Sequence, residues 1–176
     1  MELPKRKKIR LKGYDYSQNG AYFITICTEN RANLFGEIKN GVMLCSECGK
    51  IAFEEIANTN KLRGNNGIQI QKYIIMPNHI HMIIEIVGSR RAVTENPQPA
   101  EFAKPTKQSI STIIRAYKST VTKRLHELDG HGTPCPYKIW QSRFYDHIIR
   151  DEQEYHNIWN YIDTNPLKWE QDCLHS

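Results

Sequence analysis

The sequence predicts an α+β fold of the ferredoxin-like (RRM-like) kind, in which helices pack on one face of an antiparallel sheet. Three observations carry this prediction: short segments rich in β-branched and aromatic residues, longer segments with helical periodicity, and Gly- or Pro-containing turns between them. The chain has 176 residues, of which 39% are hydrophobic and 24% charged, and this fits one soluble globular domain with a buried core.

The strand predictions come from composition and turn signals. The predicted strands are residues 21–28, two short strands within 34–44, and residues 68–76 and 79–87. Residues 21–28 (AYFITICT) have the β-branched and aromatic composition of a largely buried strand. Asn40-Gly41 is a two-residue turn signal for a hairpin. Pro77 separates the last two strands because it cannot donate a hydrogen bond inside a sheet.

Three helices are predicted from capping residues and from the spacing of apolar residues. They run from Ser46 to about Asn58, from about Thr106 to Leu125, and from near Asp151 to Asn165. The second helix has its apolar stripe at Ile110, Ile113, Ile114, Tyr117, Val121 and Leu125. Pro- and Gly-containing segments at 88–105 and 126–138 are predicted loops on either side of it. The third helix begins with an acidic turn and ends at Asn165, directly before Pro166.

Positive charge is concentrated in a predicted N-terminal arm, residues 1–13, within the single domain 1–176. The net charge is +5 and the pI about 8.9. The arm contains Lys5, Arg6, Lys7, Lys8, Arg10 and Lys12. Such an arm commonly contacts phosphates, although a solvated tail has the same composition. Arg115 and Lys118 flank the apolar stripe of the second helix on one side and give it a basic edge.

The remaining composition indicates a cytoplasmic protein. Five irregularly placed cysteines suit a reducing compartment better than a disulfide scaffold. No stretch approaches the eighteen consecutive apolar residues of a membrane span, and no apolar segment of a secretory signal follows the basic arm. A membrane partner is therefore not expected.

A pair of histidines is the first candidate site. His79 and His81 are two residues apart in a predicted strand, so their side chains project from the same face. Two neutral imidazoles side by side suit a divalent ion such as Mn²⁺, Mg²⁺, Zn²⁺ or Ni²⁺. The motif occurs often by chance, and two half-exposed strand histidines are the alternative.

The last predicted helix carries the second candidate site. Its apolar stripe is Tyr155, Ile158, Trp159 and Ile162. Tyr161 lies roughly 110° from the centre of that stripe, at the edge of the buried face. Asn165 follows one turn later on the same side. A tyrosine hydroxyl and an amide oxygen in register would both face one metal-bound phosphate, while an interfacial tyrosine with a C-capping Asn is the structural alternative.

Taken together, these motifs resemble a known family. Pro77-Asn78-His79-Ile80-His81 and the apolar run after it resemble the His-hydrophobic-His motif of single-tyrosine transposases. Tyr161-Ile162-x-x-Asn165-Pro166 resembles the nucleophile helix of the REP-associated tyrosine transposases. Three further segments also resemble this family: residues 10–16 (RLKGYDY), 23–28 (FITICT) and 140–147 (WQSRFYDH). The resemblance therefore covers nearly the whole chain.

The resemblance implies a transposase-like catalytic domain and a set of roles. His79, His81 and Asn165 would bind Mg²⁺ or Mn²⁺, and Tyr161 would be the nucleophile of DNA cleavage and strand transfer through a 5′-phosphotyrosine. Many mobile relatives have Gln in place of Asn165, so a closer approach of helix to sheet is expected here. The implied partner is single-stranded hairpin DNA from a palindromic repeat, in a nucleoid-associated protein that is a possible homodimer.

The residues leave other readings open. Arg143 lies between aromatic residues and, with Trp140 and Phe144 beside it, is a candidate for DNA contact. Tyr145 and His147 form a rival pair for catalysis, and we expect a binding or supporting role for them. A non-catalytic module that binds hairpin nucleic acid is the main alternative function. A phosphodiesterase that uses water, with Tyr161 only structural, is a third.

Overall fold

The sheet is built from four antiparallel strands that are scattered along the sequence. In the computed structural model, which describes residues 14–88, 109–129, 136–172 and 174, the strand order is β4-β5-β1-β6. The strands are β1 (Gly20–Cys27), β4 (Ile68–Ile75), β5 (His79–Ile86) and β6 (Tyr145–Ile149). This order, with a helix after β1 and another after β5, is the ferredoxin-like arrangement that the sequence predicts. The predicted α+β class is confirmed.

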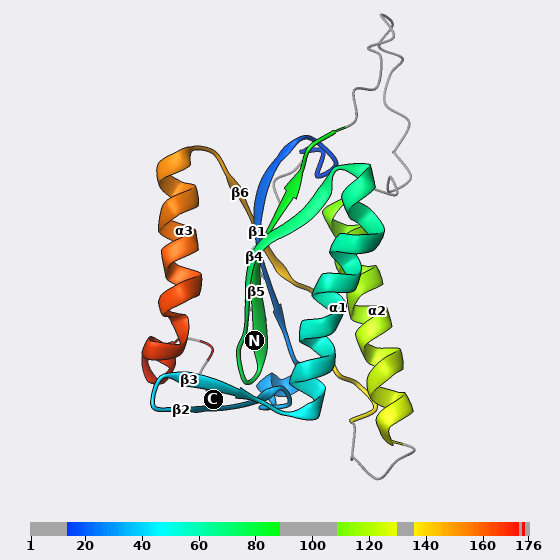
Figure 1. Ribbon diagram of the computed structural model, residues 1–176, viewed down its shortest axis with the longest axis vertical. Coiled ribbons are helices and arrows are strands. Elements are labelled where there is room, and N and C mark those ends of the chain that lie inside the picture. Colours follow the sequence, from blue (N-terminus) through cyan, green and yellow to red (C-terminus); the bar gives the residue numbers. More distant parts are fainter. Residues whose placement is uncertain (1–13, 89–108, 130–135, 173, 175–176) are drawn as a thin grey trace, which may run out of the picture.

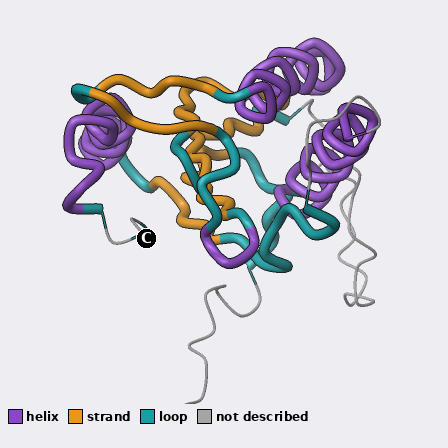
Figure 2. The backbone as a smooth tube through the Cα atoms, turned by 90° about the horizontal axis from the view of Figure 1, so that it is seen from below, coloured by secondary structure: helices purple, strands orange, loops and turns teal. Residues whose placement is uncertain are grey.

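The helices cover both faces of this sheet. α1 (Glu47–Arg63) and α2 (Ile110–Asp129) pack side by side on one face, as predicted, whereas α3 (Glu152–Thr164) lies alone on the opposite face (Figures 1 and 2). Strand β5 explains why, since residues on both of its faces are buried and both faces therefore need a cover. The expectation that all helices lie on one face of the sheet is therefore wrong for α3, because the continuous apolar run of β5 buries both of its faces.

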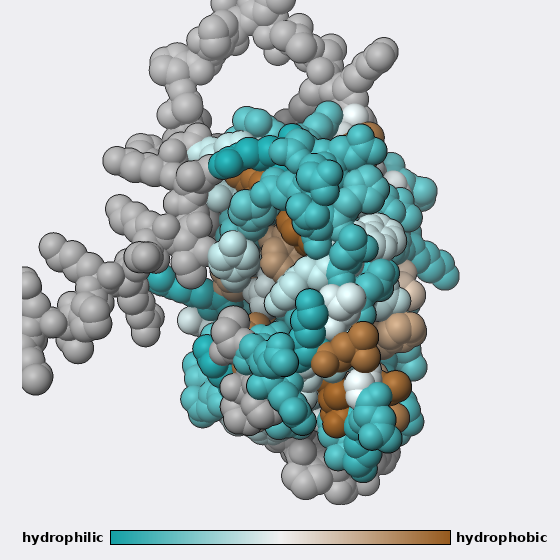
Figure 3. Space-filling model, turned by 90° about the vertical axis from the view of Figure 1, so that its left-hand side faces the viewer, coloured by the Kyte–Doolittle hydropathy of each residue, from teal (hydrophilic) through white to brown (hydrophobic). Residues whose placement is uncertain are grey.

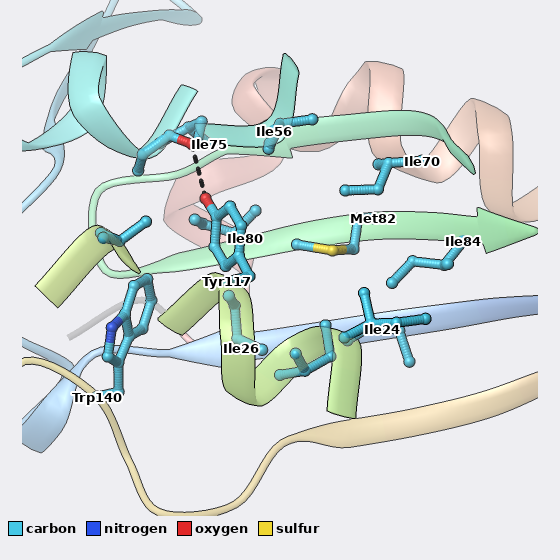
Figure 4. Packing of buried hydrophobic residues seen from close by; sticks show 14 of the residues in the cluster. Ile24, Ile26, Ile56, Ile70, Ile75, Ile80, Met82, Ile84, Tyr117 and Trp140 are labelled. Carbon is cyan, nitrogen blue, oxygen red and sulfur yellow. Dashed lines mark hydrogen bonds between the residues drawn. The ribbon is translucent and has the colours of Figure 1, made fainter. Parts of the chain in front are cut away.

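The main core lies between the sheet and helices α1 and α2. Ile80, Met82 and Ile84 of β5 are fully buried there and pack with apolar residues of β1 and α2 (Figure 4). Tyr117 of α2 is also buried, and its hydroxyl donates a hydrogen bond of 2.7 Å to the backbone oxygen of Ala52 in α1. This bond satisfies the buried hydroxyl and joins the two helices.

A smaller core attaches α3 to the other face. Ile83 of β5, Ile149 of β6 and Ile162 of α3 are its buried members, and Phe23 and Trp159 pack against them. The apolar stripe predicted for this helix is thus its inner face. On this side of the molecule the surface is mostly hydrophilic, with hydrophobic side chains gathered in a few places (Figure 3).

The remaining elements are short. A separate hairpin is formed by β2 (Gly36–Lys39) and β3 (Val42–Cys45), and three 3₁₀ segments follow β1, α1 and α3: η1 (Glu29–Arg31), η2 (Gly64–Asn66) and η3 (Asn165–Gln171). Asn40 and Gly41 have φ angles of 52° and 73° at the hairpin turn, so the predicted two-residue turn is confirmed.

Two helix boundaries differ from those expected. α1 continues to Arg63 instead of about Asn58, because the Asn60 side chain bonds both the backbone N–H and the backbone oxygen of Ile70 and ties the last turn to β4. α2 continues to Asp129, into the segment 126–138 that was predicted as a loop. The arm 1–13 and nearly all of the predicted loop 88–105 lie outside the described residues. Among those that are described, no helix has the length and apolar character needed to cross a membrane.

Candidate active site

Strand pairing positions the two histidines on the α3 face of the sheet. In the antiparallel register of β1 and β5, Thr25 lies opposite His81 and Cys27 opposite His79. The intervening Ile80 points into the main core. Both histidines are buried, with exposed fractions of 0% and 2%. The expectation of half-exposed strand histidines therefore does not describe this pair.

The two imidazoles face each other through their Nε2 atoms, which are 3.0 Å apart. Their Nδ1 atoms are engaged on the far sides: His79 with the Asn78 side-chain oxygen and His81 with the Thr25 hydroxyl, both at 2.8 Å. The Asn78 oxygen only accepts, so the Nδ1 of His79 carries the proton and its Nε2 presents a lone pair. Hydrogen bonds of this kind orient metal-binding histidines in proteins.

Burial also keeps both imidazoles uncharged. It lowers the pKa of His79 from 6.5 to about 4, against the opposing effect of the Asp172 carboxylate. It lowers the pKa of His81 well below 6.5, and the charge of His79 contributes in the same direction. Neutral imidazoles are the form that binds a metal ion. The pair is therefore ready to bind a metal at neutral pH without first losing protons.

This burial predicts a stability that depends on pH in the metal-free protein. Below about pH 6.5 the unfolded chain binds protons at His79 and His81 that the folded chain does not accept, so stability is lost as the pH falls from about 6.5 to about 4. In EDTA we expect the melting temperature to drop by on the order of 5 °C or more across this window. His79→Gln should have a shallower drop, and an identical pH profile for wild type and variant would contradict the assignment.

Tyr161 lies beside the histidine pair, at the partly exposed edge of α3. Its hydroxyl oxygen is 3.2 Å from the Nε2 of His81, and its side chain is 41% exposed. The ring stands edge-on to the Phe23 ring of β1, with centroids 6.0 Å apart. Tyr161 thus joins the two candidate sites, and its position at the edge of the buried face agrees with the position expected from helical periodicity.

Asn165 is the third predicted metal ligand, and it begins η3 directly after α3. Its side chain is 2% exposed, and its Nδ2 donates a hydrogen bond of 3.0 Å to Asp172. Its Oδ1 is buried and has no hydrogen-bond partner among the described residues. A buried amide oxygen without a partner is costly, and a hard divalent cation is a partner that would satisfy it.

Asp172 is the residue that sequence reasoning missed. The ligand atoms of His79, His81 and Asp172 lie within 4.8 Å of one another. The backbone N–H of Leu174 donates 2.7 Å to one carboxylate oxygen, while Asn165 donates to the other. Asp172 follows η3, whose irregular course has no periodic pattern in sequence, so nothing in the sequence places this carboxylate beside β5.

The donor set of His79, His81 and Asp172 could hold a divalent cation, and Asn165 adjoins it through its hydrogen bond to Asp172. Two imidazole nitrogens and a carboxylate suit Mn²⁺ and other transition metals. Two nitrogens that each bind one ion at about 2.1 Å and at a right angle are about 3.0 Å apart. This is the separation of the two Nε2 atoms.

Removing the Asp172 carboxylate is predicted to weaken metal binding. Asp172→Ala deletes a negative charge and frees the Asn165 amide to turn, so we expect the Mn²⁺ affinity to fall about tenfold or more, measured by calorimetry without DNA. Asp172→Asn keeps an oxygen acceptor for Asn165 and should lose less. Glu170→Gln is the matched control, an exposed acidic residue of the same segment, and should bind Mn²⁺ as wild type does. Equal affinities for all four proteins would remove Asp172 from the site.

The residues predicted to contact DNA do not lie on one common surface of the described structure. Arg143 is exposed and lines a pocket with Tyr161. Arg115 is exposed on α2, on the other face of the sheet. Lys118 turns inward, where its Nζ donates to the backbone oxygens of Gln141 and Arg143 and burial lowers its pKa to about 8. Lys5, Arg6, Lys7 and Arg10 lie outside the described residues. A DNA-binding role for all seven stays a prediction.

The rival pair Tyr145 and His147 lies on β6, on the same face as Tyr161. Tyr145 borders the pocket that Tyr161 lines, and its side chain is 47% exposed. The Nε2 of His147 is 2.7 Å from Glu154 in the first turn of α3, and this contact attaches the helix to β6. His147 thus contacts the helix that carries Tyr161, whereas the hydroxyl of Tyr161 itself contacts His81 of the candidate metal site.

Comparison with known proteins gives relatives along nearly the whole chain. No family model matches. An uncharacterized protein of Haemophilus influenzae is 37% identical over 174 residues, which cover 97% of this chain and 93% of that protein. A putative REP-associated tyrosine transposase of the same organism is 24% identical over 165 residues, covering 88% and 74%. The solved structure of a REP-associated tyrosine transposase bound to a REP hairpin covers 90% of this chain and 73% of its own, with 20% identity and a TM-score of 0.56, and shares the fold.

Proposed function

We propose that this chain is a member of the family of the REP-associated tyrosine transposases, one of which is 24% identical to it, and that it cleaves and rejoins single-stranded hairpin DNA through Tyr161 with the help of a divalent metal ion. One observation carries the proposal. The Tyr161 hydroxyl lies 3.2 Å from the Nε2 of His81, so the candidate nucleophile directly adjoins the candidate metal site. A domain that only binds DNA has no need of this juxtaposition.

The proposed reaction is a reversible transfer of a phosphate between two oxygens. The Tyr161 hydroxyl oxygen attacks the scissile phosphorus, the bond to the 3′ oxygen breaks, and a 5′-phosphotyrosine and a free 3′-OH result. The phenol loses its proton as the new bond forms, and the departing 3′ oxygen takes one up. The intermediate keeps the energy of the phosphodiester, so a second 3′-OH can take Tyr161's place without ATP.

The side chains around the metal site would hold the metal ion and orient its ligands and the nucleophile. His79 and His81 would hold the ion through Nε2, Asn165 through its unpartnered Oδ1, and Asp172 through its carboxylate. An ion held there would supply Lewis-acid chemistry at a non-bridging phosphate oxygen. Thr25 and Asn78 fix the imidazoles from behind, and Phe23 holds the Tyr161 ring edge-on. Exposure of Tyr161 leaves room for a DNA strand.

A covalent-adduct assay tests the proposal. Labelled single-stranded hairpins drawn from the DNA on either side of the gene would be incubated with the protein, with Mn²⁺ or with EDTA, and separated on a denaturing gel. We expect a protein–DNA adduct with Mn²⁺ and none with EDTA. Tight binding of the same hairpins without any adduct would support the alternative function, a non-catalytic hairpin-binding module. Cleavage with no adduct would indicate a phosphodiesterase that uses water.

A further inference from the structure

A pocket of about 400 Å³ is lined in part by Tyr161 and His81. Its lining joins β1, the segment that leads into β6, and α3. The members used below are Phe23, Gln141, Arg143, Phe144, Tyr145 and Tyr161. We call this set the base pocket. The pocket is also bordered by His81 and by Leu174, whose backbone N–H donates to Asp172, so it adjoins the metal site.

The walls of the base pocket are flat aromatic rings. Phe23 lies between the two tyrosines: the Tyr145 ring stands edge-on to it at 6.3 Å and the Tyr161 ring at 6.0 Å. Tyr145 is 47% exposed, so part of its ring is available for stacking. A pocket of this size accepts a single nucleobase, and aromatic rings stack on any base.

The polar members of the pocket suit the rest of a nucleotide. Arg143 is exposed at the pocket and offers a guanidinium group to a phosphate, and Gln141 offers an amide that can both donate and accept. The backbone of this segment is fixed from the opposite side, because Lys118 donates to the carbonyl oxygens of Gln141 and Arg143 at 2.9 and 3.2 Å. The wall is therefore in place before any ligand binds.

We propose that the base pocket receives one of the two unpaired nucleobases that flank the phosphate attacked by Tyr161, stacked on Tyr145. This inference rests on the proposed function, because that function places a phosphate at the Tyr161 hydroxyl. A base bound there orients the sugar–phosphate bond beside it, so the base pocket acts on positioning and on the choice of cleavage site. The ligand class is a single-stranded nucleotide with its base unstacked.

The test measures binding to two probes with the same phosphates. One is fluorescein-labelled dT12, and the other is a strand of equal length made of abasic nucleotides; both are titrated in EDTA at fixed salt and followed by anisotropy. We expect Tyr145→Ala to weaken binding of dT12 about fivefold or more and to leave the abasic strand unchanged. Tyr145→Phe keeps the ring and should bind both as wild type does. Arg143→Gln should weaken both probes equally, as loss of a phosphate contact requires.

A matched control separates the base pocket from general aromatic contact. Tyr137 is 96% exposed and does not line the pocket, so Tyr137→Ala should leave dT12 binding unchanged. The inference is overturned if Tyr145→Ala weakens both probes alike or neither, if Tyr137→Ala gives the same selective loss, or if wild type does not bind dT12. None of these binding measurements requires cleavage of the DNA. A selective loss in Tyr145→Ala without any covalent adduct would leave the base pocket standing and reject the proposed cleavage.

Discussion

Tyr161→Phe is expected to eliminate the covalent protein–DNA adduct while metal binding is retained. Phenylalanine keeps the ring that contacts Phe23 but has no oxygen to attack phosphorus, so adduct formation should fall by at least about 10³-fold, to below detection on a denaturing gel. Tyr161 is partly exposed at the edge of α3, so the fold should tolerate the loss of its hydroxyl.

The control for this prediction is the other tyrosine on the same face. Tyr145→Phe should form the adduct, because it leaves in place the Tyr161 hydroxyl that lies 3.2 Å from the Nε2 of His81. Calorimetry with Mn²⁺ should give equal affinities for wild type and Tyr161→Phe. An adduct that persists in Tyr161→Phe and disappears in Tyr145→Phe would transfer the nucleophile role to Tyr145.

His81→Gln is expected to abolish both metal binding and adduct formation. His81 contributes one of the two facing nitrogens, and it also borders Tyr161, so its loss removes a ligand at the point where metal site and nucleophile meet. Replacing a group that only orients a metal ligand typically costs about 10- to 100-fold in affinity, so we expect a loss of more than about 100-fold for the ligand itself. Titration with Mn²⁺ by calorimetry measures it directly.

Two further variants calibrate this loss. Thr25→Val removes the hydroxyl behind the Nδ1 of His81 and should lower the affinity by a smaller factor, within about 10- to 100-fold. His156→Gln changes an exposed histidine of α3 and should bind Mn²⁺ normally. If His81→Gln retained wild-type affinity, the ion would lie elsewhere and the proposed metal role of the pair would fail.

The sequence predicted the parts of this protein that depend on local periodicity. Alternation along β5 placed His79 and His81 on one face, and the angular position of Tyr161 on its helix placed it at the edge of the buried stripe. Both are consequences of backbone geometry that a single segment already contains. The Asn40-Gly41 turn was predictable for the same reason.

The parts that were not predicted depend on contacts between distant segments. Asp172 reaches the histidines only through the turn of η3, and the placement of α3 on the second face depends on burial of both sides of β5. The hydrogen bonds from the Lys118 ammonium group to the segment before β6 likewise join parts of the chain that are far apart in sequence. No pattern within any one segment contains this information.

Strand β5 divides the effects of mutation by the parity of the residue number. At even positions, Ile80, Met82 and Ile84 fill the main core, so truncating them should lower abundance and thermal stability. At odd positions, His79 and His81 carry the chemistry, and Ile83 supports the helix that bears Tyr161. A saturation mutagenesis scan of these residues, scored separately for protein level and for adduct yield, should therefore show two interleaved profiles within a single strand.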